Sequence, residues 1–176
     1  ITIDVSHIFF STPKRRFIIA DSPGHVEYTR NMVTGTSNAQ ASIILLDARK
    51  GVIEQTKRHF FITQLLGIKQ IIFAVNKMDL VDYDQTVFED IKATLTGLVD
   101  KHGKDGVVYH YTPVSALYNE NIVSRSKKLA WHHGQPLLNL IESLPVDQNQ
   151  AHDGAFQIQY VIRPKREELH DYRGFA

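Results

Sequence analysis

The sequence of 176 residues contains no cysteine, which excludes a disulfide framework and a thiolate metal site. Long apolar runs are also absent: residues 43–46 and 71–75 are the length of strands, far below the ~20 residues that a membrane span needs. Neither sign of charge is in excess: the chain has 20 Lys and Arg and 19 Asp and Glu, a formal net charge of +1. We therefore expect no membrane span and no nucleic-acid partner.

Apolar residues make up 43% of the chain, enough for a core at this length. We expect one domain of ordinary size and a piece of a second. The chain begins at Ile1 directly in an alternating pattern and stops at Ala176 in a predicted loop, so we expect a fragment of a longer protein. The absence of cysteine fits a reducing, cytoplasmic setting.

The first twenty residues predict an antiparallel hairpin. Ile1, Ile3 and Val5 alternate with polar residues, as in a strand, and residues 17–20 form a second short strand that ends at Asp21. A turn signal at residues 11–14 lies between the two strands. The basic residues 14–16 are expected to form a solvated hairpin tip.

After Asp21, strands and helices alternate. The sequence predicts strands at residues 42–47, 70–75 and 109–114, the first two apolar enough to be buried on both faces. It predicts helices at residues 26–40, 54–66, 84–101 and 136–144. This alternation indicates an α/β fold: a mostly parallel sheet with helices on both faces.

The alternation stops near Pro145, which sets the predicted domains. Residues 1–145 form the first domain and the polar residues 146–153 a linker. Alternating residues then restart a strand, so residues 154–176 are expected to begin a β-rich second domain.

The first polar motif, Asp21-Ser22-Pro23-Gly24-His25, follows a strand at the sheet edge where open α/β folds bind ligands. Asp21 can hold Mg²⁺ through water, and Gly24 can bring its backbone N–H to a terminal phosphate. His25 can point at an attacking water. An ordinary strand-to-helix turn uses the same residue types, so the motif alone leaves that alternative open.

The second motif is Asn76-Lys77-Met78-Asp79, directly after a buried strand. Guanine presents two neighbouring N–H donors that one carboxylate accepts together, and adenine cannot supply the pair, so Asp79 is the predicted base reader. Asn76 can bridge the base and neighbouring loops, and the stem of Lys77 can lie along the ring. The alternative is a polar loop that only ends a strand.

Two weaker signals gain meaning from their order. Ser115-Ala116-Leu117 follows the third strand, where backbone N–H groups can meet the guanine carbonyl oxygen. Thr2 is most simply a β-branched strand residue. One hairpin before Asp21, however, it has the position of a switch threonine that binds Mg²⁺ and senses the γ-phosphate.

These motifs, in this order and spacing, resemble the GTP-binding domain of the elongation factor Tu superfamily over essentially the whole chain. The resemblance implies a P-loop GTPase fold with GTP and Mg²⁺ as ligands. It implies that His25 acts on the hydrolytic water and that Thr2 and Asp21 serve the metal. The phosphate-binding G-x-x-x-x-G-K-[ST] loop, which precedes Ile1 in the family, is absent, so the resemblance is to an N-terminally truncated domain.

Within the superfamily, one branch is favoured by Tyr28-Thr29-Arg30-Asn31-Met32, by residues 45–59 (LLDARKGVIEQTKRH) and by Trp131 followed by Gly134-Gln135-Pro136. These stretches are similar to the large, GTPase subunit family of bacterial sulfate adenylyltransferase. That similarity implies GTP hydrolysis coupled to formation of adenylyl sulfate and pyrophosphate from ATP and sulfate, in sulfate assimilation. It also implies a small catalytic subunit as partner. Residues 165–170 are longer than the family pattern.

Two other functions compete with this interpretation. A translation elongation factor that delivers aminoacyl-tRNA shares the superfamily, but residues 28–32 and the Trp131 region disfavour it. A nucleotide-independent interaction module is the third hypothesis, because the chain has no phosphate loop. Three other features are expected to lie outside the site: His59 as a structural or solvated residue, Arg49-Lys50 as a solvated basic turn or a partner contact, and His132-His133 as no metal site.

Overall fold

The computed structural model describes residues 5–24, 32–33, 39–145, 161–162 and 174–175. It divides the chain into two units, Ile1–Pro145 and Val146–Ala176. Thr2, His25 and the predicted linker at residues 146–153 lie outside the described residues, as does most of the predicted helix at residues 26–40. Of that helix, residues 32–33 are described and are helical.

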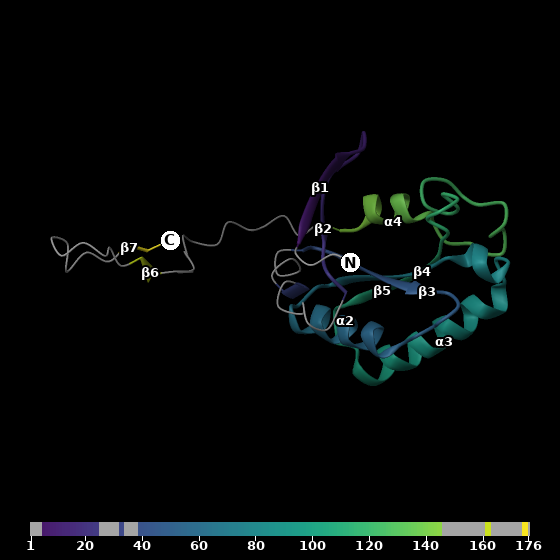
Figure 1. Ribbon diagram of the computed structural model, residues 1–176, viewed down its shortest axis with the longest axis horizontal. Helices are drawn as coiled ribbons and strands as arrows, with labels where there is room; N and C mark the ends of the chain where they lie inside the picture. Colours follow the sequence, from purple (N-terminus) through teal and green to yellow (C-terminus); the bar gives the residue numbers. More distant parts are fainter. Residues whose placement is uncertain (1–4, 25–31, 34–38, 146–160, 163–173, 176) are drawn as a thin grey trace. The chain divides into compact units, whose positions relative to one another are not determined.

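Three parallel strands in the order β3-β4-β5 form the centre of the first unit (Figure 1). They are β3 (Ser42–Asp47), β4 (Gln70–Asn76) and β5 (Val108–Pro113). Residues 70–75 of β4 are all buried, as the apolar run predicts. In β3 the burial alternates: Ile44 and Leu46 are buried, whereas Leu45 is 64% exposed. Burial on both faces therefore holds for β4 but is wrong for β3.

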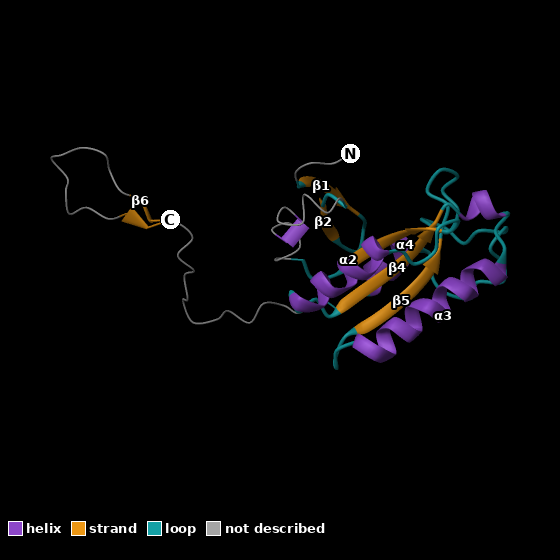
Figure 2. Cartoon of the chain, turned by 60° about the horizontal axis from the view of Figure 1, so that its bottom comes forward, coloured by secondary structure: helices purple, strands orange, loops and turns teal. Residues whose placement is uncertain are grey.

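Helices cover the sheet on its two faces (Figures 1 and 2). On one face lie α2 (Glu54–Leu65) and α3 (Gln85–His102), and over the other lies α4 (Leu137–Ser143). Asp84 caps α3, because its Oδ1 accepts from the Thr86 N–H at 2.6 Å. Gly67 follows α2 in a left-handed backbone conformation, with a φ of +73°. The predicted α/β fold is confirmed.

The core lies between the sheet and the helices α2 and α3. Phe60 of α2 is fully buried, and its ring centroid lies 6.1 Å from those of both Phe73 on β4 and Tyr109 on β5. From α3, Phe88, Ile91 and Leu95 join the same cluster. On α3 the apolar spacing predicts the face that packs on the sheet, whereas on α2 the apolar pair Phe61 and Leu65 is 39% and 78% exposed.

A separate antiparallel hairpin is formed by β1 (Ser6–Ser11) and β2 (Arg16–Asp21). The rings of Phe10 and Phe17 stack across it with centroids 4.7 Å apart. The hairpin is as predicted, but the first strand begins at Ser6, where the predicted one ends. The pairing register, with Ser11 opposite Arg16, follows from the turn at residues 12–15 and not from the alternation at the chain start.

In the hairpin tip Lys14 and Arg16 are exposed, as expected, but Arg15 is half-buried and is not a solvated residue. The Arg15 guanidinium donates to the carbonyl oxygens of Ile141 (3.2 Å) and Leu144 (2.9 Å), near the end of α4. Lys14 forms an ion pair with Glu142 at 3.1 Å. The last carbonyls of a helix have no partner inside it, so cations at this position satisfy them.

The second unit contributes two short described strands. Its strands β6 (Val161–Ile162) and β7 (Gly174–Phe175) pair antiparallel. That residues 154–176 begin a β-rich domain stays a prediction.

Truncating the central aromatic residue tests this core. Phe60→Ala should lower the free energy of unfolding by about 3–5 kcal/mol, because a fully buried ring is replaced by a cavity. Phe9→Ala is the control: its side chain is 71% exposed on β1, so its effect should stay within about 1 kcal/mol. Urea unfolding of both variants measures the difference, and equal losses would contradict the described core.

Candidate functional site

The side chain of Asn76 joins the loops that follow β4 and β5. Its Oδ1 accepts from the backbone N–H of Lys77 at 2.7 Å and from that of Ala116 at 3.0 Å. Because β4 and β5 are parallel neighbours, their C-terminal ends meet at one edge of the sheet. Two of the three predicted motifs are therefore brought together by a single amide.

The carboxylate of Asp79 is fixed at this edge by Ser115. Asp79 lies in a short 3₁₀ helix, η2 (Met78–Val81), whose first side chain is fully buried. The Met78 N–H donates to the carbonyl of Val114 at 3.2 Å, and the buried hydroxyl of Ser115 donates to Asp79 Oδ1. A carboxylate held in this way offers acceptors in a fixed direction to a pair of N–H donors.

The loop after β5 is held by Asn121, a residue that the sequence motifs do not include. Its buried Nδ2 donates to the carbonyl of Pro113 at 2.8 Å and to Thr112 Oγ1 at 3.3 Å. Within the loop, Ser115 and Glu120 exchange two backbone hydrogen bonds. The side chain of Leu117 is 77% exposed, so this residue offers the site its backbone.

Asp47, at the end of β3, is paired with two cations. It accepts from Lys77 Nζ at 2.9 Å and from Arg49 at 2.7 Å and 3.0 Å. The Arg49 guanidinium, and after it Lys77, hold the pKa of this carboxyl well below its usual range, although partial burial acts in the opposite direction. Arg49 is thus part of a charged network beside the second motif and not a plain surface residue.

The sequence contains one signal that indicates this network. Asp47 stands last in one predicted strand and Asn76 directly follows the next, and the two are partners in the parallel register of β3 and β4. Because Asp47 pairs with Asn76 in this register, its carboxylate comes within reach of the next residue, Lys77. The backbone of Lys77 is left-handed, with φ +64°.

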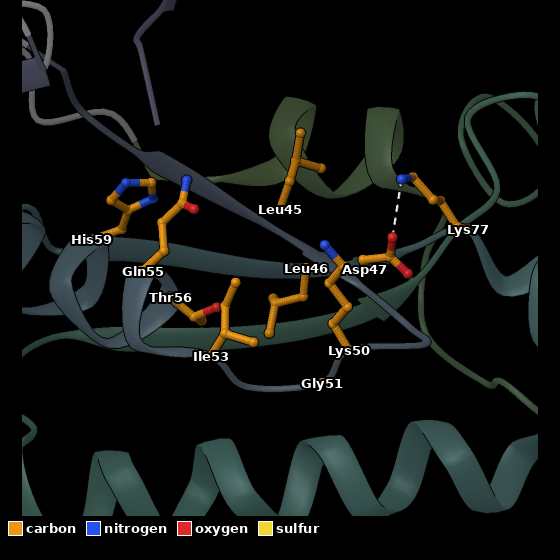
Figure 3. A pocket seen from close by; sticks show the side chains of 10 residues that line it. All are labelled: Leu45, Leu46, Asp47, Lys50, Gly51, Ile53, Gln55, Thr56, His59 and Lys77. Atoms are coloured by element: carbon orange, nitrogen blue, oxygen red, sulfur yellow. Dashed lines mark hydrogen bonds and ion pairs between the residues drawn. The ribbon is translucent and has the colours of Figure 1, made fainter. Parts of the chain in front are cut away.

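A cleft of ≈ 230 Å³ runs along β3 beside this network (Figure 3). Asp47 and Lys77 lie at one end, and Gln55 and His59 of α2 lie at the other. The full lining comprises Leu45, Leu46, Asp47, Lys50, Gly51, Ile53, Gln55, Thr56, His59 and Lys77. The cleft is polar at both ends and apolar along the strand.

The first motif meets the far end of this cleft through Gly24. A Cβ on Gly24 would lie 2.4 Å from Gln55 Nε2 and 3.6 Å from His59 Cε1, so both side chains lie against this peptide. Burial lowers the pKa of His59, although a hydrogen bond with the Gly24 backbone acts in the opposite direction. His59 is therefore not a solvated residue.

The remaining residues of the first motif are placed only in part. Asp21 is exposed at the end of β2, Ser22 is half-buried, and Pro23 is fully buried. The roles predicted for Thr2 and His25 stay predictions.

In the part of the chain that the structure describes, no three His, Asp or Glu side chains group as metal ligands. In the same residues, no helix is long and apolar enough to cross a membrane.

Comparison with known proteins identifies one family and two sets of relatives, namely curated proteins and solved structures. The family "Elongation factor Tu GTP binding domain" matches residues 1–146. Sulfate adenylyltransferase subunit 1 of Sulfurovum sp. (strain NBC37-1) is 52% identical over 177 residues, and that of Cellvibrio japonicus is 51% identical over 178. Each match covers 100% of this chain but 36% of the relative's length.

Solved structures match the fold at lower identity. The structure of sup35 complexed with GMPPNP has a TM-score of 0.63 and 26% identity, over 79% of this chain and 34% of that one. A bacterial selenocysteine-specific elongation factor, EF-Sec, has a TM-score of 0.60 and 26% identity, over 68% of this chain and 20% of that one.

Acid titration tests the network around Asp47. Its lowered pKa means that the folded chain binds this proton less readily than the unfolded chain, whose value is near 3.8. The contribution of Asp47 to the free energy of unfolding is therefore complete above the unfolded pKa of 3.8, and it is lost as pH falls from there through the lower folded pKa. In urea unfolding, the advantage of the wild type over Asp47→Asn should stay constant from about pH 7 to 5 and shrink below about pH 4. Arg49→Ala should weaken this pH dependence, and an advantage unchanged at pH 3 would contradict the account.

Proposed function

We propose a function from one premise: the chain belongs to the family of the elongation factor Tu GTP-binding domain. The proposed ligand is GTP, and the proposed site is the sheet edge that holds Asn76, Asp79 and Ser115. The observation that carries the proposal is the joining of the loops after β4 and β5 through one amide and one carboxylate.

The proposed base pocket uses the fixed directions of these groups. Asp79 would accept from the two N–H groups of guanine, a charged bidentate contact that adenine cannot make. Asn76 holds the loops on which the base rests, Lys77 lays its stem along the ring, and Met78 anchors the turn. The backbone N–H groups of Ala116 and Leu117 would meet the guanine carbonyl oxygen.

The proposed phosphate side uses the first motif. Asp21 is an exposed carboxylate at the end of β2 and, as a hard oxygen donor, it fits Mg²⁺. Thr2 is the second proposed metal residue. Mg²⁺, when bound, would neutralise charge on the phosphates. Ser22 and Pro23 shape the turn, Gly24 offers its N–H to the terminal phosphate, and His25 orients the attacking water.

The proposed activity of the whole protein follows from its relatives. The chain spans about a third of the curated relatives that it matches, which are sulfate adenylyltransferase subunit 1 at about half identity. We infer a GTPase subunit that couples GTP hydrolysis to formation of adenylyl sulfate from ATP and sulfate. Its proposed partner is the small catalytic subunit, and its proposed setting is the cytoplasm. These relatives favour this function over delivery of aminoacyl-tRNA.

The proposed arrangement of the chain has three parts. Residues 1–145 bind the nucleotide, residues 146–153 are a linker, and residues 154–176 begin a β-rich domain. The family match, which ends at residue 146, supports a boundary at this place.

Changing the base reader tests the function. In the full-length protein, Asp79→Asn should weaken GTP binding by roughly 2–4 kcal/mol, because a charged bidentate contact is lost. The same variant should bind xanthosine triphosphate better than the wild type does, since xanthine presents an acceptor where guanine has its amino group. Competition against a fluorescent guanine nucleotide measures both affinities. Unchanged GTP binding in the folded variant would remove Asp79 from the role.

Removing His25 tests the hydrolytic role. His25→Ala in the full-length protein should keep nucleotide affinity and lower single-turnover GTP hydrolysis by about 10²–10⁴, the usual effect of a lost water-orienting group. GTP-driven adenylyl sulfate formation should fall with it. If His25 instead only packs at the start of a helix, the variant loses thermal stability while hydrolysis per folded molecule stays intact. That outcome would refute the catalytic assignment.

A further inference from the structure

Gln55 and His59 make direct contact with the loop that carries Gly24. The tip of Gln55 occupies the place where a side chain on residue 24 would begin, at 2.4 Å from that Cβ position. The His59 ring lies against the same residue, with its Cε1 3.6 Å from that Cβ position, and the Gly24 backbone faces the ring as a hydrogen-bond acceptor, which acts to raise its pKa. Both side chains come from α2, more than thirty residues further along the chain.

Their positions on α2 explain why they act together. Gln55 and His59 are four residues apart, so they share one face of the helix. On other faces the helix is held by Thr56 and Phe60, which are 4% and 0% exposed. A helix anchored in the core in this way is a rigid support for the two side chains that face Gly24.

The same two side chains line the cleft along β3 (Figure 3). The other end of the cleft is formed by Lys77 and by Asp47, which holds Lys77 at 2.9 Å. The cleft therefore runs from Lys77, whose stem belongs to the proposed base pocket, to the two side chains that contact Gly24. A nucleotide with its base against Lys77 and its phosphates along this cleft would direct them toward Gln55 and His59.

We propose that Gln55 and His59 are positioning residues that fix the Gly24 peptide so that its N–H faces the terminal phosphate of GTP. The inference rests on the proposed function and extends it, because it names side chains outside the three sequence motifs. Neither residue touches the reacting atoms. They act through Gly24, and their effect depends on the presence of a γ-phosphate.

The chemistry of the two side chains suits this role. At neutral pH an imidazole with a lowered pKa is uncharged, so it holds the peptide by a hydrogen bond without adding charge beside the phosphates. The charged neighbour on its own helix, Arg58, also favours the uncharged ring. The Gln55 amide fills the space that the absence of a side chain on Gly24 leaves, so the peptide cannot shift toward α2 without displacing it.

The test is the ratio of affinities for a non-hydrolysable GTP analogue and for GDP, in the full-length protein. His59→Ala and Gln55→Ala should each lower the GTP-analogue affinity by about tenfold, the size of one lost hydrogen bond, while GDP affinity stays as in the wild type. His59→Gln and His59→Asn retain a side-chain N–H, and at least one of them should restore the ratio. Isothermal titration with both nucleotides gives the values.

His110→Ala is the matched control. His110 is also a half-buried histidine with a pKa lowered by burial, but it lies on β5 with Gln70 as its neighbour at 3.3 Å. The His110→Ala variant should have a lower thermal midpoint than the wild type but the same ratio of GTP-analogue affinity to GDP affinity. Gln55 is exposed, so its truncation leaves a folded protein to measure even if His59→Ala does not fold.

The outcomes separate the inference from the function on which it rests. A wild type that binds GDP, with Gln55→Ala and His59→Ala variants of unchanged ratio, overturns the positioning role and leaves the proposed function standing. A ratio that falls in His110→Ala as well shows a general effect of stability and overturns the role too. A wild type that binds no guanine nucleotide overturns both.

Discussion

Strand β4 is buried along residues 70–75, so its backbone groups depend on hydrogen bonds to the strands on both sides. Those strands, β3 and β5, both run parallel to it. Parallel pairing brings the C-terminal ends of all three strands to one edge, where polar residues can emerge from the core. Asp47, Asn76 and Ser115 stand at or just beyond those ends. The candidate site exists because this strand is buried and paired on both edges.

At that edge the polar groups bind one another first. Asn76 holds the backbone of two loops, Ser115 holds Asp79, and Asp47 holds Lys77. These contacts fix the directions of the groups before a ligand arrives, so less conformational freedom remains to be lost on binding. At the opposite end of the cleft, α2 does the same for the Gly24 peptide through Gln55 and His59.

Sequence patterns predicted the parts of this arrangement that depend on local periodicity. The apolar runs gave β3 and β4, and helical spacing gave α2 and α3 to within two residues at each end. The meeting of Asn76 with Ala116 follows from the parallel pairing of the strands before them. The family resemblance, carried by the same motifs, is confirmed by the comparisons.

Contacts between distant side chains were not predictable in this way. Arg15 looks like a solvated turn residue in sequence, yet it binds carbonyls at the end of α4. His59 likewise gives no local sign of its partner Gly24, and Asp47 gives none of Lys77, because these contacts arise only through packing of the fold. Of the predicted first strand, residues 1–4 lie outside the described residues, and the described pairing from Ser6 onward takes its register from the turn.

The central claim is that this sheet edge recognises guanine through a pair of N–H donors, and nucleotide competition on the unaltered full-length protein tests it most directly. GDP, IDP and ADP would each displace a bound fluorescent GDP. IDP has no 2-amino group and loses one of the two charge-assisted hydrogen bonds, so the account predicts affinity about 10- to 100-fold below that of GDP, with ADP weaker still. Equal affinities of GDP and IDP, or displacement by ADP at the same concentration as GDP, would contradict it.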